Sequence, residues 1–386
     1  MAAMSDAVSP FRIEVPRHAL QDLRERLLRT RLPEPIEGAG WDYGIDIAYL
    51  KELLAYWRDR FDWRVVEREL ARYQHFVTPI EGAQLHFLHQ RSPHEGAMPL
   101  LLTHGWPGSI LEFMKILPRL LDPPAFGGES RDAFHVVCPS IPGYGFSQAP
   151  LRRGFDIKEV ARALVTLMSR LGYERYGAQG GDWGAMATSY VGLLDPQHCA
   201  GIHLNMVLAR PPKEGVGDLS PEELASLMQA RSYMSTGTAY QKVQGREPDL
   251  IGVAHADSPA ALCAWIVHKF RAWSDCDGDV EKRFTKDELL ANVTLYWLTR
   301  SAASAARLYY ESQASGRFGE VEARVEVPVG CAVFPREIFT PPRAWAERLY
   351  NIQRWTTMPA GGHFAAMEEP ELLARDVAEF FRGLRV

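Results

Sequence analysis

The chain has 386 residues, of which 46% are hydrophobic and 11% aromatic, so it can bury a large apolar core. Its formal net charge is -5 and its pI is about 6.2, which argue against a nucleic-acid-binding protein, because such a protein needs a basic face. We therefore expect a folded globular protein whose partner is not a nucleic acid.

The sequence shows no sign of a membrane anchor or of an exported protein. No segment reaches the ~18 consecutive apolar residues of a membrane-spanning helix. The first six residues, Met-Ala-Ala-Met-Ser-Asp, have neither the basic start nor the apolar stretch of a signal peptide. Five scattered cysteines show no metal-ligand spacing, so we expect buried reduced thiols. These features predict a cytoplasmic location.

Residues 1–80 are expected to form an N-terminal helical extension. Apolar residues recur at helical spacing from Ile45 to Phe61, which predicts an amphipathic helix. Acidic residues are interleaved with the basic residues between Arg17 and Arg31, as is typical of a solvated helix face.

Strands and helices alternate in residues 81–208 and again in residues 325–386. Strands are predicted at 84–90, 98–103, 134–138, 329–334 and 354–358, and helices at 157–171 and 370–384. This alternation predicts an α/β fold with a mostly parallel sheet and helices on both faces.

The intervening residues 209–324 have a different composition. They hold helical patterns at 221–234, 259–273 and 286–310, with no convincing strand. A helical lid inserted into the sheet domain is the simplest account. The ligand would then lie between this lid and the carboxyl ends of the strands.

Asp182 stands at the centre of the strongest local motif, Gly180-Gly181-Asp182-Trp183-Gly184. Such a turn lets a strand pass sharply into a helix and raises the central residue above the sheet as a nucleophile, as in the α/β-hydrolase fold. A carboxylate in this place would attack a saturated carbon and leave an alkyl ester on the enzyme. A plain glycine-rich turn is the alternative.

A second motif, His104-Gly105-Trp106-Pro107-Gly108-Ser109, follows a predicted buried strand. In this fold the loop after that strand supplies one N–H group of the oxyanion hole, and the residue after the nucleophile supplies the other. The expected donors are the N–H groups of Trp106 and Trp183. The motif is also good turn chemistry without any such role.

His363 lies in Gly361-Gly362-His363-Phe364, between the last predicted strand and the last predicted helix. It is the last member in the chain order nucleophile, acid, histidine. The acid is expected after a late strand, which favours Glu337. The end of the earlier strand, the other place for an acid, carries Asn205.

Together the motifs HGWPGS, GGDWG and GGHFAAMEEP resemble those of the microsomal-type epoxide hydrolases and their juvenile-hormone and bacterial relatives. The segments 11–33 and 63–78 resemble the N-terminal domain of that family, so the likeness covers nearly the whole chain. The resemblance implies an α/β-hydrolase core and a small-molecule epoxide, with water, as substrates. It also implies detoxification or natural-product biosynthesis as the role. The membrane anchor of the mammalian enzymes is not carried over.

The resemblance also implies two lid tyrosines that bind the epoxide oxygen. Tyr309 matches the family pattern, with its neighbour Tyr310 as the alternative, and Tyr240 is the expected second tyrosine, with Tyr233 as its competitor. A phenol with a pKa of ~10 can donate a hydrogen bond at neutral pH without being ionised. No metal and no organic cofactor is expected, and a homodimer is left open.

Other functions fit parts of the same pattern. A haloalkane dehalogenase would share the Asp nucleophile and the base, whereas a carboxylesterase would carry serine in place of Asp182. A non-catalytic ligand carrier would not need the charged set Asp182, Glu337 and His363. The sequence therefore favours epoxide hydrolysis over all three.

Overall fold

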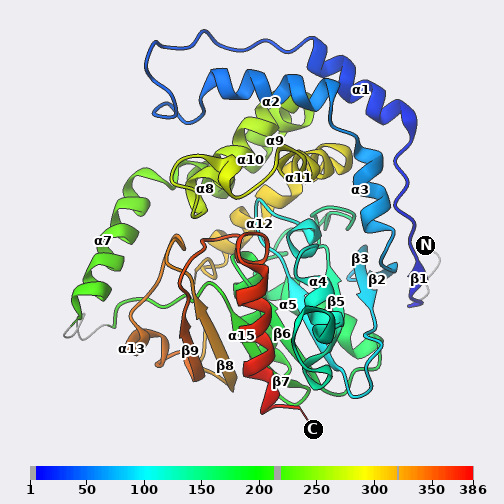
Figure 1. Cartoon of the computed structure of the whole chain (residues 1–386), viewed down its shortest axis with the longest axis vertical. Helices are drawn as coiled ribbons and strands as arrows, with labels where there is room; N and C mark the ends of the chain where they lie inside the picture. Colours follow the sequence, from blue (N-terminus) through cyan, green and yellow to red (C-terminus); the bar gives the residue numbers. More distant parts are fainter. Residues whose placement is uncertain (1–5, 213–218, 320, 386) are drawn as a thin grey trace.

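The computed structural model describes residues 6–212, 219–319 and 321–385. Within these ranges, nine strands form one sheet in the order β1-β2-β3-β5-β4-β6-β7-β8-β9 (Figure 1). The pairs β1–β2, β2–β3 and β3–β5 are antiparallel, and the other neighbouring pairs are parallel. The mostly parallel sheet predicted from the sequence is therefore confirmed. The strands are Ser9–Pro10 (β1), His75–Ile80 (β2), Ala83–Gln90 (β3), Met98–Thr103 (β4), Phe134–Pro139 (β5), Tyr176–Gly180 (β6), Cys199–Leu204 (β7), Val325–Val333 (β8) and Tyr350–Thr357 (β9).

Helices cover both faces of the sheet. Successive residues of a strand point to opposite faces. In β7, Ile202 faces Gly192 of α6, whereas its neighbour Gly201 faces Phe380 of α15. Helix α5 packs on α6, and α4 packs beside α15, which Figure 1 shows in red in front of the strands. The helices are Leu117–Leu121 (α4), Ile157–Arg170 (α5), Trp183–Leu194 (α6) and Pro370–Arg382 (α15).

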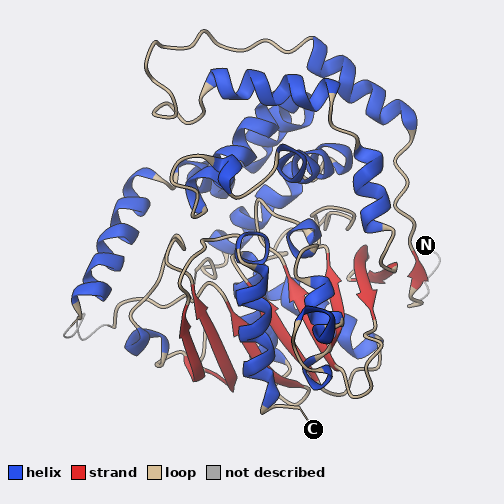
Figure 2. Cartoon of the chain, in the orientation of Figure 1, coloured by secondary structure: helices blue, strands red, loops and turns tan. Residues whose placement is uncertain are grey.

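Between β7 and β8, the described part of the chain forms the predicted helical lid. Figure 2 shows helices gathered above the sheet. The helical pattern at 286–310 forms two helices, because Arg300 adopts a left-handed conformation (φ 54°) that ends the first one. The lid helices are Pro221–Thr236 (α7), Ala239–Arg246 (α8), Pro248–Asp257 (α9), Pro259–Trp273 (α10), Lys286–Thr299 (α11) and Ala302–Ala314 (α12).

The N-terminal extension contains helices and also two strands of the sheet, β1 and β2. Its helices are Arg17–Leu28 (α1), Ile47–Asp59 (α2) and Trp63–Leu70 (α3). We call residues 17–59 the strap, since α1 and α2 lie across the lid helices α10 and α11 (Figure 1). Arg26 of the strap bonds to Asp257 at 2.9 Å, and Tyr56 donates to Asp287 at 3.1 Å. The extension therefore joins the sheet at one end and the lid at the other.

All five cysteines are buried and unpaired, as predicted. In the described ranges no single helix is long and apolar enough to cross a membrane. Helices α9 and α10 pass that test only when taken together, and they are bent by 117° relative to each other.

Candidate active site

Asp182 occupies a strained turn between β6 and α6. Its backbone has φ 52° and ψ -127°, a combination that residues other than glycine rarely adopt. The flanking glycines are required by close packing: a Cβ at Gly180 would lie 2.3 Å from the carbonyl oxygen of Gly184. A Cβ at Gly184 would lie 1.9 Å from the carbonyl oxygen of Thr103. The sequence therefore forms a nucleophile elbow with an aspartate at its tip.

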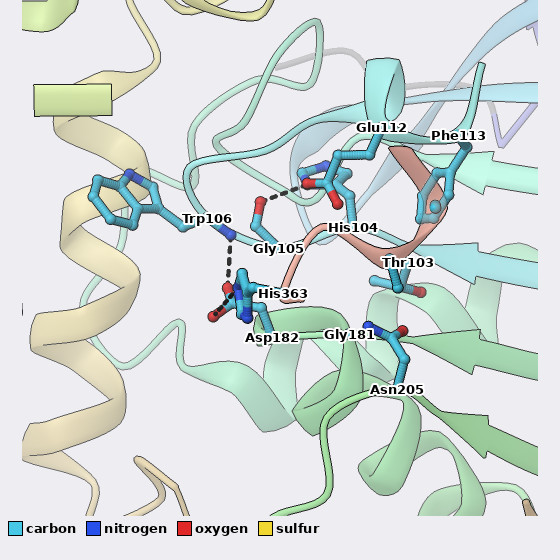
Figure 3. Close-up of a pocket in the computed structure, with 12 residues that line it drawn as sticks. Thr103, His104, Gly105, Trp106, Glu112, Phe113, Gly181, Asp182, Asn205 and His363 are labelled. Atoms are coloured by element: carbon cyan, nitrogen blue, oxygen red, sulfur yellow. Dashed lines mark hydrogen bonds and ion pairs between the residues drawn. The ribbon is translucent and has the colours of Figure 1, made fainter. Parts of the chain in front are cut away.

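The loop after β4 holds one oxygen of that aspartate. The N–H of Trp106 donates to Oδ1 of Asp182 at 2.7 Å (Figure 3). Gly105 lies so close that a Cβ there would be 2.4 Å from the same oxygen. Trp183, the other predicted donor, begins α6 directly after Asp182 and is buried. Its role as a second oxyanion donor stays a prediction.

His363 and Glu337 complete the charged set. Nδ1 of His363 lies 2.7 Å from Oε1 of Glu337, and Nε2 lies 3.5 Å from Oδ2 of Asp182. The side chains of His363 and Glu337 are only 3% and 2% exposed. The backbone N–H of His363 donates to the carbonyl of Trp273 at 3.0 Å. The lid thus fixes the histidine loop, and the structure brings together the three residues predicted as a triad.

Two neighbouring carboxylates change the pKa of His363. Burial alone would lower its pKa, but the negative charge of Glu337 and the hydrogen bond and charge of Asp182 raise it well above the usual value. Part of this increase depends on the charge of Asp182. If that carboxylate became an ester, the pKa of His363 would fall, and a larger fraction of the ring would be unprotonated and available to take a proton.

Tyr309 and Tyr240 lie over the elbow, with ring centroids 6.0 Å apart. Tyr309 meets the edge of Trp183 at 4.7 Å, and Tyr240 stacks on Trp106 at 5.0 Å. Burial and the charge of Asp182 raise the pKa of both tyrosines well above the usual value; the phenol of Tyr233 adds to the increase at Tyr240, and the phenol of Tyr240 adds to the increase at Tyr309. Both hydroxyls therefore stay protonated and able to donate.

The two alternative tyrosines occupy different places. Tyr310 is 45% exposed, although its neighbour Tyr309 is buried. The hydroxyl of Tyr233 lies 3.3 Å from that of Tyr240 and donates to it, so Tyr233 supports Tyr240. The geometry thus favours Tyr309 and Tyr240, and their roles stay predictions.

Sequence reasoning missed two charged residues near the site. Lys269 is buried, and its ammonium lies 4.3 Å from the centre of the Tyr240 ring. Glu112 lines the cavity beside Asp182 and His363. Each is a lone charge within a predominantly apolar segment, Trp-Ile-Val-His-Lys-Phe and Ile-Leu-Glu-Phe-Met. A single charged residue among apolar neighbours was the only sign in the sequence that these two side chains are buried near the site. Asn205, at the other place for an acid, accepts a hydrogen bond from Gln179 at 2.8 Å.

The fold and this site define an α/β hydrolase with aspartate at the nucleophile position. A family model described as "alpha/beta hydrolase fold" matches residues 98–233. A second, described as "Epoxide hydrolase N terminus", matches residues 8–113, so it extends beyond residue 80.

Comparison with known proteins narrows this class to one family. Epoxide hydrolase 1 of Oryctolagus cuniculus is 39% identical over 97% of this chain and 89% of its own. A candidate epoxide hydrolase of Stigmatella aurantiaca is 48% identical over 98% and 86%. The crystal structure of juvenile hormone epoxide hydrolase from Bombyx mori superposes with a TM-score of 0.92 and 34% identity, covering 99% of this chain and 96% of that one. The chain belongs to the microsomal-type epoxide hydrolase family.

Proposed function

We propose that the protein converts an epoxide to a vicinal diol through an alkyl ester on Asp182. The observation that supports this most is how the two oxygens of the Asp182 carboxylate are held. Its Oδ1 accepts the N–H of Trp106, while its Oδ2 faces Nε2 of His363 at 3.5 Å. The carboxylate is thus oriented before substrate binds, as nucleophilic attack requires.

In the first step Oδ2 of Asp182 attacks a ring carbon and the C–O bond of the epoxide breaks. The ring oxygen is a poor leaving group because it departs as an alkoxide. Tyr309 and Tyr240 would donate hydrogen bonds to it, and one of them would transfer its proton as the ring opens. Their buried, protonated hydroxyls over the elbow fit this role.

In the second step His363 takes a proton from water, and the water oxygen bonds to Cγ of Asp182. The oxyanion that forms would accept the N–H of Trp106, with the N–H of Trp183 as the predicted second donor. The intermediate then collapses, and the diol oxygen leaves Cγ and takes the proton held by His363. The water proton that remains on the Asp182 carboxyl returns to the tyrosinate left by ring opening. Ester formation removes the charge of Asp182, which lowers the pKa of His363 at the stage where a base is needed.

The variant His363→Gln tests this mechanism. It should still form the ester with styrene oxide but hydrolyse it at least about 10²-fold more slowly, the lower range of a general base's contribution. The ester should appear in the intact mass as an increase equal to one substrate, located on Asp182 by peptide mapping.

Isotope labelling of the unmodified enzyme provides a second measurement. In a single turnover in ¹⁸O-water, the label should enter Asp182 and not the diol, because water attacks Cγ. Label in the first diol would contradict the ester mechanism. Chloride release from a chloroalkane, without diol from styrene oxide, would favour a dehalogenase.

A further inference from the structure

A small cavity lies on the core side of Asp182. In Figure 3 the ring of Trp106 lies on one side of Asp182, and Glu112, Phe113, Thr103 and Asn205 lie on the other. The lid tyrosines pack on the Trp106 side. An epoxide held by those tyrosines would therefore leave the core side of the carboxylate open. The cavity lies on that side.

The size of this cavity suits water. The cavity has a volume of about 10 Å³, which is close to the minimum that one ordered water needs. A substrate carbon skeleton would not fit. The cavity is bordered by both Asp182 and His363, the two groups that the second step must bring together with water.

Polar groups line the cavity. The hydroxyl of Thr103 is fully buried and has no hydrogen-bond partner among the described residues. Asn205 and Glu112 border the same space.

Glu112 reaches this place because of a glycine in the neighbouring loop. A Cβ at Gly108 would lie only 1.2 Å from Oε1 of Glu112, so the carboxyl occupies the space that any larger residue at 108 would need. Ile110 and Phe113 beside it are buried, whereas Glu112 keeps some accessible surface. Part of the Glu112 surface borders the cavity.

The protonation of Glu112 fits contact with water. Burial raises its pKa to about 8; the His363 charge acts against this increase and the Asp182 charge adds to it. At neutral pH the group is mostly a neutral acid, so it does not compete with Asp182 for the charge of His363. A neutral carboxyl can both donate to water and accept from it.

We propose that this cavity holds the water consumed in the second step, and that Glu112 positions that water beside His363. This inference rests on the proposed ester mechanism. One hydrogen of the water contacts the Glu112 carboxyl and the other goes to His363, while the water oxygen bonds to Cγ of Asp182. Glu112 is then a positioning residue for hydrolysis, with no part in ring opening.

Three variants test this role by measuring the two steps separately in single turnovers with styrene oxide. Glu112→Met should form the ester within about twofold of the normal rate and hydrolyse it at least tenfold more slowly. Glu112→Gln, which keeps a hydrogen-bonding group, should recover most of the hydrolysis rate. Gly108→Ala should reproduce the hydrolysis defect of Glu112→Met, because the added methyl displaces the carboxyl without changing its chemistry.

Controls separate positioning from stability. Glu67→Gln makes the same substitution at a partly buried carboxylate of α3 that bonds Val15 and Trp63 and pairs with Arg64, and should leave both steps unchanged. The melting temperature of each variant reports on folding. The double variant Gly108→Ala, Glu112→Met should be no slower than either single variant, since both remove the same contact.

The outcomes are distinct. Selective slowing of hydrolysis by Glu112→Met and Gly108→Ala, with an ester that accumulates, supports the proposal. Unchanged hydrolysis, or equal slowing of both steps, overturns it while leaving the proposed function intact. Failure of the unmodified enzyme to form any ester on Asp182 overturns the proposed function itself, and this inference with it.

Discussion

At the scale of single residues, the groups for ring opening and those for ester hydrolysis surround Asp182 from different directions. The lid side of Asp182 carries aromatic rings and phenols, whereas the core side carries a carboxyl and an unpaired hydroxyl. His363 packs against the lid residue Trp273 and also borders the cavity on the core side. Ring opening needs donors that stay protonated, and ester hydrolysis needs a base and water. Because the two sets lie on different sides, a variant of one set should affect only its own step.

Tyr309→Phe should slow ester formation by roughly 10²-fold, because it removes one of two donors to the departing oxygen. Ester hydrolysis should change much less. The adjacent Tyr310→Phe is a matched control, since that side chain is 45% exposed, and it should leave both rates unchanged. Rapid-quench measurement of the ester distinguishes the steps. Equal slowing of both steps by Tyr309→Phe would contradict its role as ring-opening acid.

The raised pKa of Glu112 also makes a prediction about stability and pH. Burial raises this pKa from 4.5 to about 8. Below pH 4.5 both the folded and the unfolded states hold the proton. Between 4.5 and 8 the unfolded chain releases it first, so the free energy of unfolding falls as pH rises, and the loss is complete above pH 8.

Glu112→Gln lacks this group and should gain stability relative to the normal protein between pH 5 and 8. The expected gain is at least about 1.4 kcal/mol, the equivalent of one pKa unit. Denaturant midpoints at both pH values measure it, with Glu67→Gln as the control. Glu368, whose pKa burial raises to about 7, adds the same trend to both proteins and cancels in the comparison. A constant difference between pH 5 and 8 would show that Glu112 is ionised in the fold.

At the scale of helices and strands, regular periodicity was enough to predict most of the core. The strand Met98–Thr103 and the helix Pro259–Trp273 have the bounds expected from the sequence, because turn residues or proline mark their ends. Strand β8 begins at Val325 and not at the predicted residue 329. The exposed charged residue Glu326 hid its start, because a polar residue interrupts the apolar run.

Features set by packing between distant segments could not be predicted in this way. The break at Arg300 has no glycine or proline to mark it. Strand β1 is two residues long and forms only because β2 lies beside it. The position of Glu112 depends on the absence of a side chain at Gly108. The predicted triad residues were easier to find because chain order limits where an acid and a histidine can lie in this fold.

At the scale of the whole molecule, the strap connects parts that are far apart in the sequence. Leu23 and Leu27 of α1 are buried in the same apolar cluster as the lid residues Ile266 and Trp297. Ionic contacts such as Arg26 with Asp257 lie at the surface. Since exposed ion pairs contribute at most about 1 kcal/mol, the apolar residues should dominate the attachment.

Leu27→Ala should therefore lower the free energy that holds the strap on the lid by about 2–5 kcal/mol, the usual range for truncating a buried leucine. Arg26→Ala should change stability by at most about 1 kcal/mol. Limited proteolysis of the native protein measures the difference as faster cleavage in residues 29–46, which connect α1 to α2. Equal cleavage rates for the two variants would show that the ionic contacts carry the attachment.

The strap also imposes an order in time. Arg26 and Tyr56 each bond to a residue 231 positions further along the chain. During synthesis from the N-terminus, α1 and α2 must therefore wait until these lid residues have been produced. Their apolar faces are open throughout that interval, which favours binding by chaperones. The strap is thus expected to reach its native place only after the lid that follows it in the sequence has formed.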